Sequence, residues 1–98
     1  MIKNILLTYD INIKQTNVKN AMIRKGYSEE KYSFSSRKTF TLPNTTLLKK
    51  EEELRVVTVL NDLQEVIDVL NKGIATKDKI ILEKAMAVEF TTWKAIEN

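Results

Sequence analysis

A short apolar run near the N-terminus ends abruptly at a carboxylate. Residues 4–12 are Asn-Ile-Leu-Leu-Thr-Tyr-Asp-Ile-Asn, and the part from Ile5 to Tyr9 is almost continuously hydrophobic. Such a run predicts a central strand that is covered on at least one face. Asp10 then lies at the strand end, where side chains leave the core and meet solvent. A carboxylate at that point either holds a metal ion or caps the following turn.

The residue types that are missing limit the chemistry of this chain. Its 98 residues include no cysteine and no histidine. Zinc sites built from thiolate or imidazole are therefore excluded within the chain, as are Cys-His and Ser-His-Asp nucleophiles. Any metal ion must be held by oxygen ligands, which favours Mg²⁺, Mn²⁺ or Ca²⁺.

Length and composition predict one ordinary globular domain over residues 1–98. Hydrophobic residues make up 43% of the chain and charged residues 30%, with a net charge of +3. A chain of this size has too little interior for a large cofactor pocket. The small basic excess permits contact with nucleic acid. The N-terminal apolar run is far shorter than a membrane span and no cleavage pattern follows it, so we expect a cytoplasmic protein without membrane contact.

The hydrophobic pattern alternates between the periods of strands and helices. It predicts a strand over 5–9 and then a helix over 17–25, which is capped by Thr16 or Asn17 and ended by Gly26. Strands over 37–42 and 45–48 follow, joined as a hairpin through Pro43-Asn44. The last two elements are a helix that ends at Asn71 and a strand over 80–90.

Two segments leave alternatives open. Helical spacing from Val56 to Leu70, preceded by three glutamates at 51–53, favours one long helix. In the alternative, residues 54–59 form a β-branched strand and the helix begins near Asn61. Residues 83–96 also contain good helix formers, but alternation from 80 to 90 favours a strand. It places Ile80, Leu82, Met86, Val88 and Phe90 on one side.

The predicted order is strand, helix, strand, strand, helix, strand. This is the ferredoxin-like plan of the α+β class, in which both helices cover one face of an antiparallel sheet. The opposite face stays open, and pairing two such faces would bury leftover apolar side chains. We therefore expect a homodimer. Because this fold carries many unrelated activities, function has to be argued from a site.

The segment Leu6-Leu7-Thr8-Tyr9-Asp10-Ile11 resembles the first strand of the small CRISPR-associated adaptation proteins, whose chains have about this length and element order. The resemblance implies a dimer in which the strand-end aspartates of two subunits face each other across the axis and can share a divalent metal. Some members of that family are nucleases. Others are non-catalytic bridges between integrase subunits.

Two functions follow from these observations. The preferred one is a homodimeric binding or scaffolding module for protein or nucleic acid, because one carboxylate without an accompanying motif is weak support for catalysis. The alternative is an endonuclease for RNA or DNA, in which Asp10 from both subunits holds Mg²⁺ or Mn²⁺ and is catalytic. Tyr9 and Asn12 would then orient water or phosphate.

Basic and aromatic residues supply the remaining candidates. Arg37, Lys38, Lys49 and Lys50 gather near the predicted hairpin, where they either neutralise phosphates or protect exposed strand edges. Tyr27, Tyr32 and Phe34 either pack the loop over 27–36 onto the core or stack on bases. Trp93 is expected to anchor the C-terminal tail on its own subunit or on the partner.

Overall fold

The structure, a computed structural model, describes residues 1–33 and 36–94. In these residues the chain forms β1 (Ile2–Ile11), α1 (Gln15–Arg24), β2 (Glu30–Ser33), β3 (Lys38–Thr41), β4 (Thr46–Glu52), α2 (Val56–Asn71), a 3-10 turn (Thr76–Asp78) and β5 (Leu82–Phe90). The α+β class is confirmed, with one strand more than expected. Within the same ranges, no helix has the length and apolar character needed to cross a lipid bilayer.

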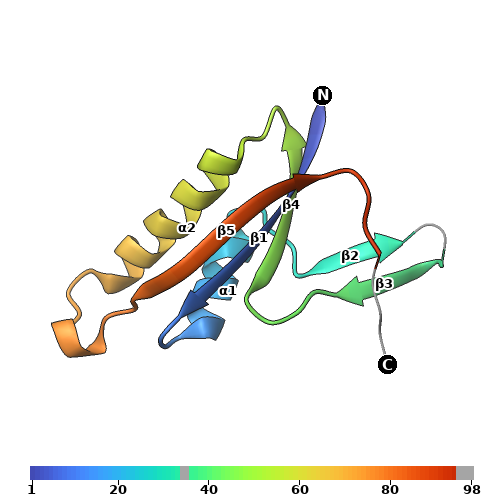
Figure 1. Ribbon diagram of the computed structural model, residues 1–98. Coiled ribbons are helices and arrows are strands. Elements are labelled where there is room, and N and C mark those ends of the chain that lie inside the picture. The colour runs from blue at the N-terminus through green and yellow to red at the C-terminus, as the bar shows by residue number, and fades with distance from the viewer. Residues whose placement is uncertain (34–35, 95–98) are drawn as a thin grey trace.

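Three strands form the main sheet, which is antiparallel with β1 between β4 and β5. Leu7 at its centre lies opposite Leu47 of β4 and Ala87 of β5. In Figure 1 the helices α1 and α2 lie on one side of this sheet, and β2 and β3 extend to the side as a separate two-stranded hairpin. We call the side of the main sheet that α1 and α2 cover its helix face, and the other side its open face.

The core lies between the helix face and the two helices. Successive residues of a strand point to opposite faces, so alternate residues of β1 enter the core. Helical spacing does the same for α2, whose inward residues recur at intervals of three and four. The core contains Ile5, Leu7, Tyr9 and Ile11 of β1, Val18 and Met22 of α1, Leu47 of β4, and Val59, Leu63, Val66 and Ile67 of α2.

The long helix predicted for the second half of the chain is confirmed, but its predicted acidic start is wrong. Helix α2 begins at Val56, and its first turn carries no acidic residue. Glu51 and Glu52 instead lengthen β4, where Glu51 lies opposite Lys3 of β1, and Glu53 occupies a turn. Their side chains bind cations of the sheet: Glu51 lies 3.3 Å from Nζ of Lys49, and Glu52 and Glu53 accept hydrogen bonds from the N-terminal ammonium of Met1.

The two ends of α1 match the prediction unequally. Gly26 ends the helix in a left-handed conformation, with φ of 100°, and its N–H bonds to the carbonyl of Ile23. The predicted cap at Thr16 or Asn17 is wrong. The helix begins at Gln15, after Lys14 in a left-handed conformation, and Lys14 makes no side-chain cap bond.

The predicted hairpin has the wrong partner strand. β3 pairs with β2, in the segment expected to be a loop, and β4 pairs with β1. The turn after Pro43 redirects the chain, because the N–H of Thr46 bonds to the carbonyl of Pro43 and Thr45 has a φ of 60°. β4 therefore leaves β3 and joins the main sheet.

A bulge in β5 changes which side chains reach the core. Asp10 pairs with Lys84 but the next residue, Ile11, pairs with Leu82, so Glu83 is the extra residue. The predicted single apolar side of this strand is wrong for that reason. Ile80 and Leu82 pack with the core, whereas Met86 lies opposite Thr8 on the open face. Ala85 and Ala87 lie on the helix face of the strand, where Ala87 packs with the core and Ala85 stays exposed, and Met86, Val88 and Phe90 lie on the open face.

Candidate functional site

Asp10 lies on the open face at the far end of β1. Its side chain is exposed, and its register partner on β5 is Lys84. Both residues line a shallow hollow of about 300 Å³ together with Thr8 and Met86. Opposite charges in directly paired positions of two strands stabilise the pairing. The sheet therefore places a cation, rather than a second carboxylate, opposite Asp10.

The described part of the chain does not supply a ready-made set of metal ligands. Residues 1–33 and 36–94 contain no group of three or more Asp, Glu, His or Cys residues that could hold a metal ion. The described residues that line the hollow beside Asp10 include no second carboxylate.

The structure does not bring Tyr9 beside Asp10. Tyr9 points into the core and is only 2% exposed, because its neighbour in the strand faces the opposite way. Burial raises the pKa of its hydroxyl, which finds no hydrogen-bond partner among the described residues. Tyr9 contributes to the wall of the hollow beside Asp10, but its side chain is buried in the core.

Asn12 fastens the segment that leads into β5. Its amide accepts from the N–H of Ile81 at 2.6 Å and donates to the carbonyl of Lys79 at 3.2 Å. Asn71, at the end of α2, makes the same pair of bonds with Ile80, at 2.8 and 2.9 Å. The two asparagines thus hold the entry to β5 from opposite sides. Both polar groups of Asn12 are already used in this structural role.

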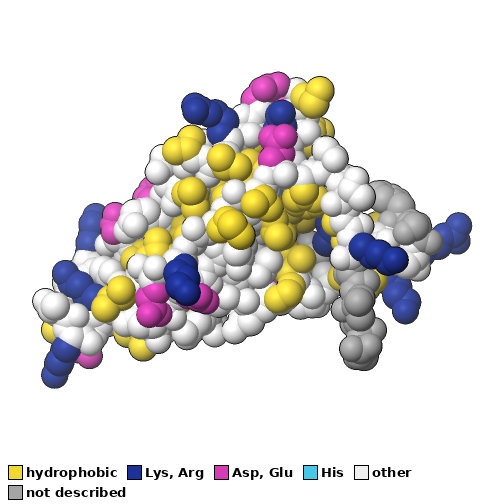
Figure 2. Space-filling view, in the orientation of Figure 1, with side chains coloured by type: hydrophobic (Ala, Val, Ile, Leu, Met, Phe, Trp, Pro, Cys, Tyr) yellow, Lys and Arg dark blue, Asp and Glu magenta, His cyan; other side chains and the backbone are white. Residues whose placement is uncertain are grey.

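The four predicted phosphate-binding residues do not form one surface. Arg37 and Lys38 lie together at the outer end of the hairpin, where both are exposed. Lys50 is exposed on β4 and lies opposite Asn4, on the open face. Lys49 points the other way, toward the helices. Figure 2 shows Lys and Arg side chains at the hairpin end of the molecule and also at its opposite end.

Lys49 belongs to an internal polar cluster. Its Nζ atom lies 3.3 Å from Glu51, 3.8 Å from Asp62 of α2, and 4.9 Å from the centre of the Tyr27 ring. The Tyr27 hydroxyl donates to Asp62 at 2.9 Å. Burial, and then this hydrogen bond, raises the pKa of Tyr27 far above its usual value, so the hydroxyl remains a donor. Lys49 therefore joins β4 to α2 rather than facing a ligand.

The aromatic residues also divide between core and surface. Tyr27 packs in the core as part of this cluster, whereas Tyr32 is exposed on the hairpin. Phe34 lies outside the described residues. Trp93 anchors the tail on its own chain, because its ring meets Phe40 of the hairpin edge-on, with 5.8 Å between ring centres.

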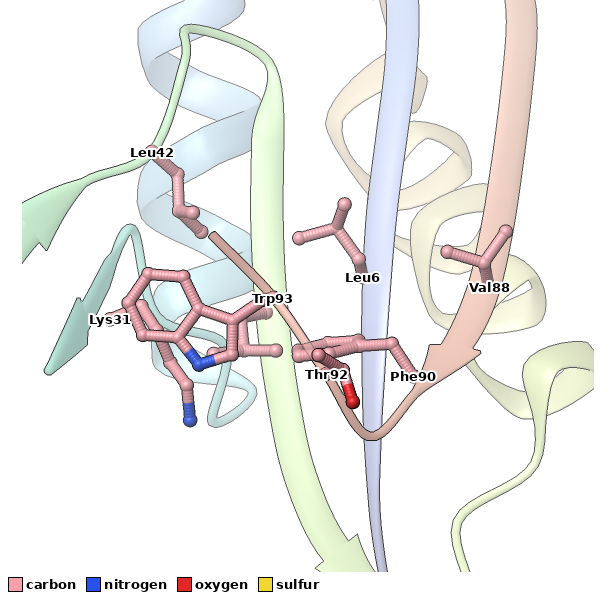
Figure 3. A pocket seen from close by; sticks show the side chains of 8 residues that line it. Leu6, Lys31, Leu42, Val88, Phe90, Thr92 and Trp93 are labelled. Atoms are coloured by element: carbon pink, nitrogen blue, oxygen red, sulfur yellow. The ribbon is translucent and has the colours of Figure 1, made fainter. Parts of the chain in front are cut away.

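The tail and hairpin enclose an apolar cavity on the open face that the sequence did not indicate. The cavity has a volume of about 200 Å³. Lys31 reaches over the Trp93 ring at 5.9 Å from its centre, as Figure 3 shows. The alternation of β5 and the position of Trp93 were visible in the sequence, but not that they meet. The lining consists of Leu6, Lys31, Leu42, Leu48, Val88, Phe90, Thr92 and Trp93.

The open face around this cavity is strongly apolar. Met86 and Val88 of β5 are 59% and 41% exposed, and Ile2 of β1 is 53% exposed. Figure 2 shows hydrophobic side chains collected over β1, β4 and β5 in the middle of this face. Contiguous apolar surface of this kind marks an interaction site more often than a solvated surface.

Comparison of the chain with family models, with curated proteins and with solved structures finds no match.

Proposed function

We propose that this protein is a small homodimeric scaffolding module, similar to the CRISPR-associated adaptation proteins. In this proposal the open faces of two copies pack together, and the exposed hairpins contact nucleic acid. The main sheet has the first strand at its centre and the last strand beside it, with α1 and α2 on one face. This arrangement supports a ferredoxin-like architecture.

The observation that carries the proposal is the outward direction of Met86, Val88 and Phe90. The bulge at Glu83 gives the helix face of β5 two alanines and leaves three large apolar side chains on the open face. Of the two alanines, Ala87 packs against the core and Ala85 stays exposed. Large apolar residues on a solvent-facing side lower the free energy only when something covers them. A second copy of the chain has the same three apolar side chains on its open face, so two such faces can cover each other.

The shape of the molecule leaves room for a standard interface. The molecule extends 48 by 33 by 21 Å, so it is a thin slab whose broad side includes the open face. A protomer in a standard protein interface buries about 800 Å². The broad side of the slab measures 48 by 33 Å with the hairpin included, which leaves room for an interface of this class. Its centre is apolar and its edges carry charges, as in known interfaces.

Sedimentation equilibrium tests the dimer. We expect the molar mass of the wild-type protein to rise from 11.3 kDa toward twice that value between about 1 and 100 μM, the range in which interfaces of this size commonly associate. A mass that stays at 11.3 kDa throughout this range would show that the open face does not join two copies.

Arg37 and Lys38 support nucleic acid as the partner of the hairpin. Both are exposed on a two-stranded arm that extends beyond the main sheet, as Figure 1 shows. Such an arm can reach a phosphate backbone while the open face is covered by the second subunit. Contacts to phosphates give binding that weakens steeply with salt and depends little on base sequence.

Removing both charges should weaken nucleic-acid binding. We expect the double variant Arg37→Gln/Lys38→Gln to bind a labelled DNA duplex about 10-fold more weakly at about 50 mM salt. The slope of log affinity against log salt should fall by roughly two per protomer, because each lost phosphate contact removes about one unit. Fluorescence anisotropy over a salt series measures both quantities.

Lys72→Gln/Lys77→Gln is the matched control. These exposed lysines lie near the end of α2 and in the following turn, so the variant loses the same charge elsewhere. It should retain the wild-type affinity within about two-fold. Equal losses in both double variants would instead indicate attraction to net charge alone, and the hairpin would have no special role.

A further inference from the structure

We propose that each protomer of the dimer inserts Met86 into the cavity beneath the hairpin of its partner. The inference rests on the proposed function, because it assigns the contacts of the open face. It adds a specific knob, a specific hole and the position of the two-fold axis.

Met86 has the properties of a knob. It is 59% exposed near the middle of β5, and its cross-strand neighbour on the open face is the short side chain of Thr8. The next residue of β5 on the same face is Val88, which is also shorter. Methionine is unbranched and polarizable, so it can enter an irregular hole without a strict shape requirement.

The cavity has the properties of the matching hole. Its volume of about 200 Å³ accommodates several waters or one long unbranched side chain. The rings of Phe90 and Trp93 form part of the wall, and a thioether gains about 0.3–1.5 kcal/mol from contact with an aromatic ring. The apolar lining offers water few hydrogen bonds. Filling the hole with an apolar side chain restores dispersion contacts that its walls otherwise lack.

Knob and hole lie on the same face, which suits a two-fold dimer. In such a dimer, if Met86 enters the partner's cavity, the partner's Met86 enters this one. The axis must then pass midway between Met86 and the cavity. Val88 follows Met86 on the open side of β5 and also lines the cavity, so it lies beside the axis.

This position of the axis has a consequence for Asp10. The register of β1 and β5 places Asp10 and Lys84 beyond Met86, on the side away from the cavity. The two Asp10 side chains are therefore farther apart than the two Met86 side chains. They do not meet across the axis, and the dimer is held by apolar contacts rather than by a shared metal ion.

A double-mutant cycle tests the insertion. Met86→Ala removes the knob, and Leu42→Phe fills the hole from its own wall. Each change should raise the dimer dissociation constant about 10-fold, measured by sedimentation. Because both remove the same contact, the double variant should also be weakened about 10-fold rather than 100-fold. Circular dichroism and thermal unfolding check that each variant folds.

The fluorescence of Trp93 provides a second measurement, which does not require the Leu42→Phe substitution. It is the chain's single tryptophan, and it lines the hole. Acrylamide quenching of its emission should be at least two-fold weaker in the wild-type dimer than in the Met86→Ala variant at equal dimer fraction. The control variant Val69→Ala changes an exposed residue of α2, and its Trp93 emission should be quenched by acrylamide as strongly as that of the wild type.

The outcomes separate this inference from the proposed function. The wild-type protein could dimerise while neither Met86→Ala nor Leu42→Phe changes the dimer dissociation constant. Alternatively, the effects of the two changes on that constant could multiply in the double variant. Either result overturns the insertion of Met86 but is compatible with the dimer. Equal quenching in wild type and Met86→Ala overturns it as well. A wild-type protein that stays monomeric removes the inference and the proposed function together.

Discussion

The Val88→Lys variant should remain monomeric at concentrations where the wild-type protein is a dimer. Val88 is 41% exposed at the centre of the apolar open face. A lysine there is well solvated in the monomer, but dimerisation would bury two ammonium groups without partners, at a cost of several kcal/mol each. We expect the dissociation constant to rise at least 100-fold, which corresponds to about 2.7 kcal/mol. Sedimentation equilibrium measures this change.

Val57→Lys is a close match as a control. Val57 is 43% exposed, carries the same side chain, and lies in the first turn of α2 on the other layer of the molecule. Its replacement should leave the dimer dissociation constant within about two-fold of the wild-type value. If Val57→Lys dissociates the dimer and Val88→Lys does not, the subunits meet through the helix layer and our assignment of the interface is wrong.

Truncating Leu7 to alanine should cause the largest loss of folding stability. Leu7 is fully buried in the central strand, opposite Leu47 and Ala87. Leu→Ala changes at such positions lower the free energy of unfolding by about 2–5 kcal/mol, because they remove apolar contacts and leave a cavity. Neighbouring side chains are held by the sheet register and collapse poorly into the space. We therefore expect a loss of about 3–4 kcal/mol in urea denaturation.

Leu6→Ala is the control that shows how the loss of stability depends on which face of the main sheet the leucine occupies. Leu6 is the preceding residue of the same strand, but it points to the open face and stays partly exposed. Both leucine variants should be measured at a protein concentration at which the wild-type protein is monomeric, so that subunit association does not contribute. Leu6→Ala should then cost about 1 kcal/mol. Equal losses at Leu6 and Leu7 would contradict a core that lies on one side of the main sheet.

Much of the fold was predictable wherever a pattern is local. The continuous run in β1, the helical spacing of α2 and the left-handed end of α1 at Gly26 each depend on a few neighbouring residues. The hairpin was not predictable in the same way. Residues 30–33 show no hydrophobic alternation, and β2 exists because β3 supplies its hydrogen bonds.

Strand register determines which face of the sheet each side chain occupies, and this is the part of the site that the sequence did not reveal. Lys49 and Lys50 are neighbours in one basic run, yet the pleat sends the first into an internal ion-pair cluster and the second to solvent. The bulge at Glu83 reverses the sides of β5 by one extra residue, which no alternation pattern predicts. An open face was expected from the sequence, but its residues became apparent only with the strands in place.

The most direct test of the central claim is chemical cross-linking through single introduced cysteines, because the chain has no cysteine of its own. Val88→Cys and Val57→Cys would each be treated with a bis-maleimide of about 10 Å span, well short of the 21 Å thickness of the slab. We predict that Val88→Cys forms a covalent dimer rapidly and Val57→Cys does not. Cross-linking of Val57→Cys alone, or equal slow reaction of both, would contradict an interface formed by the open faces.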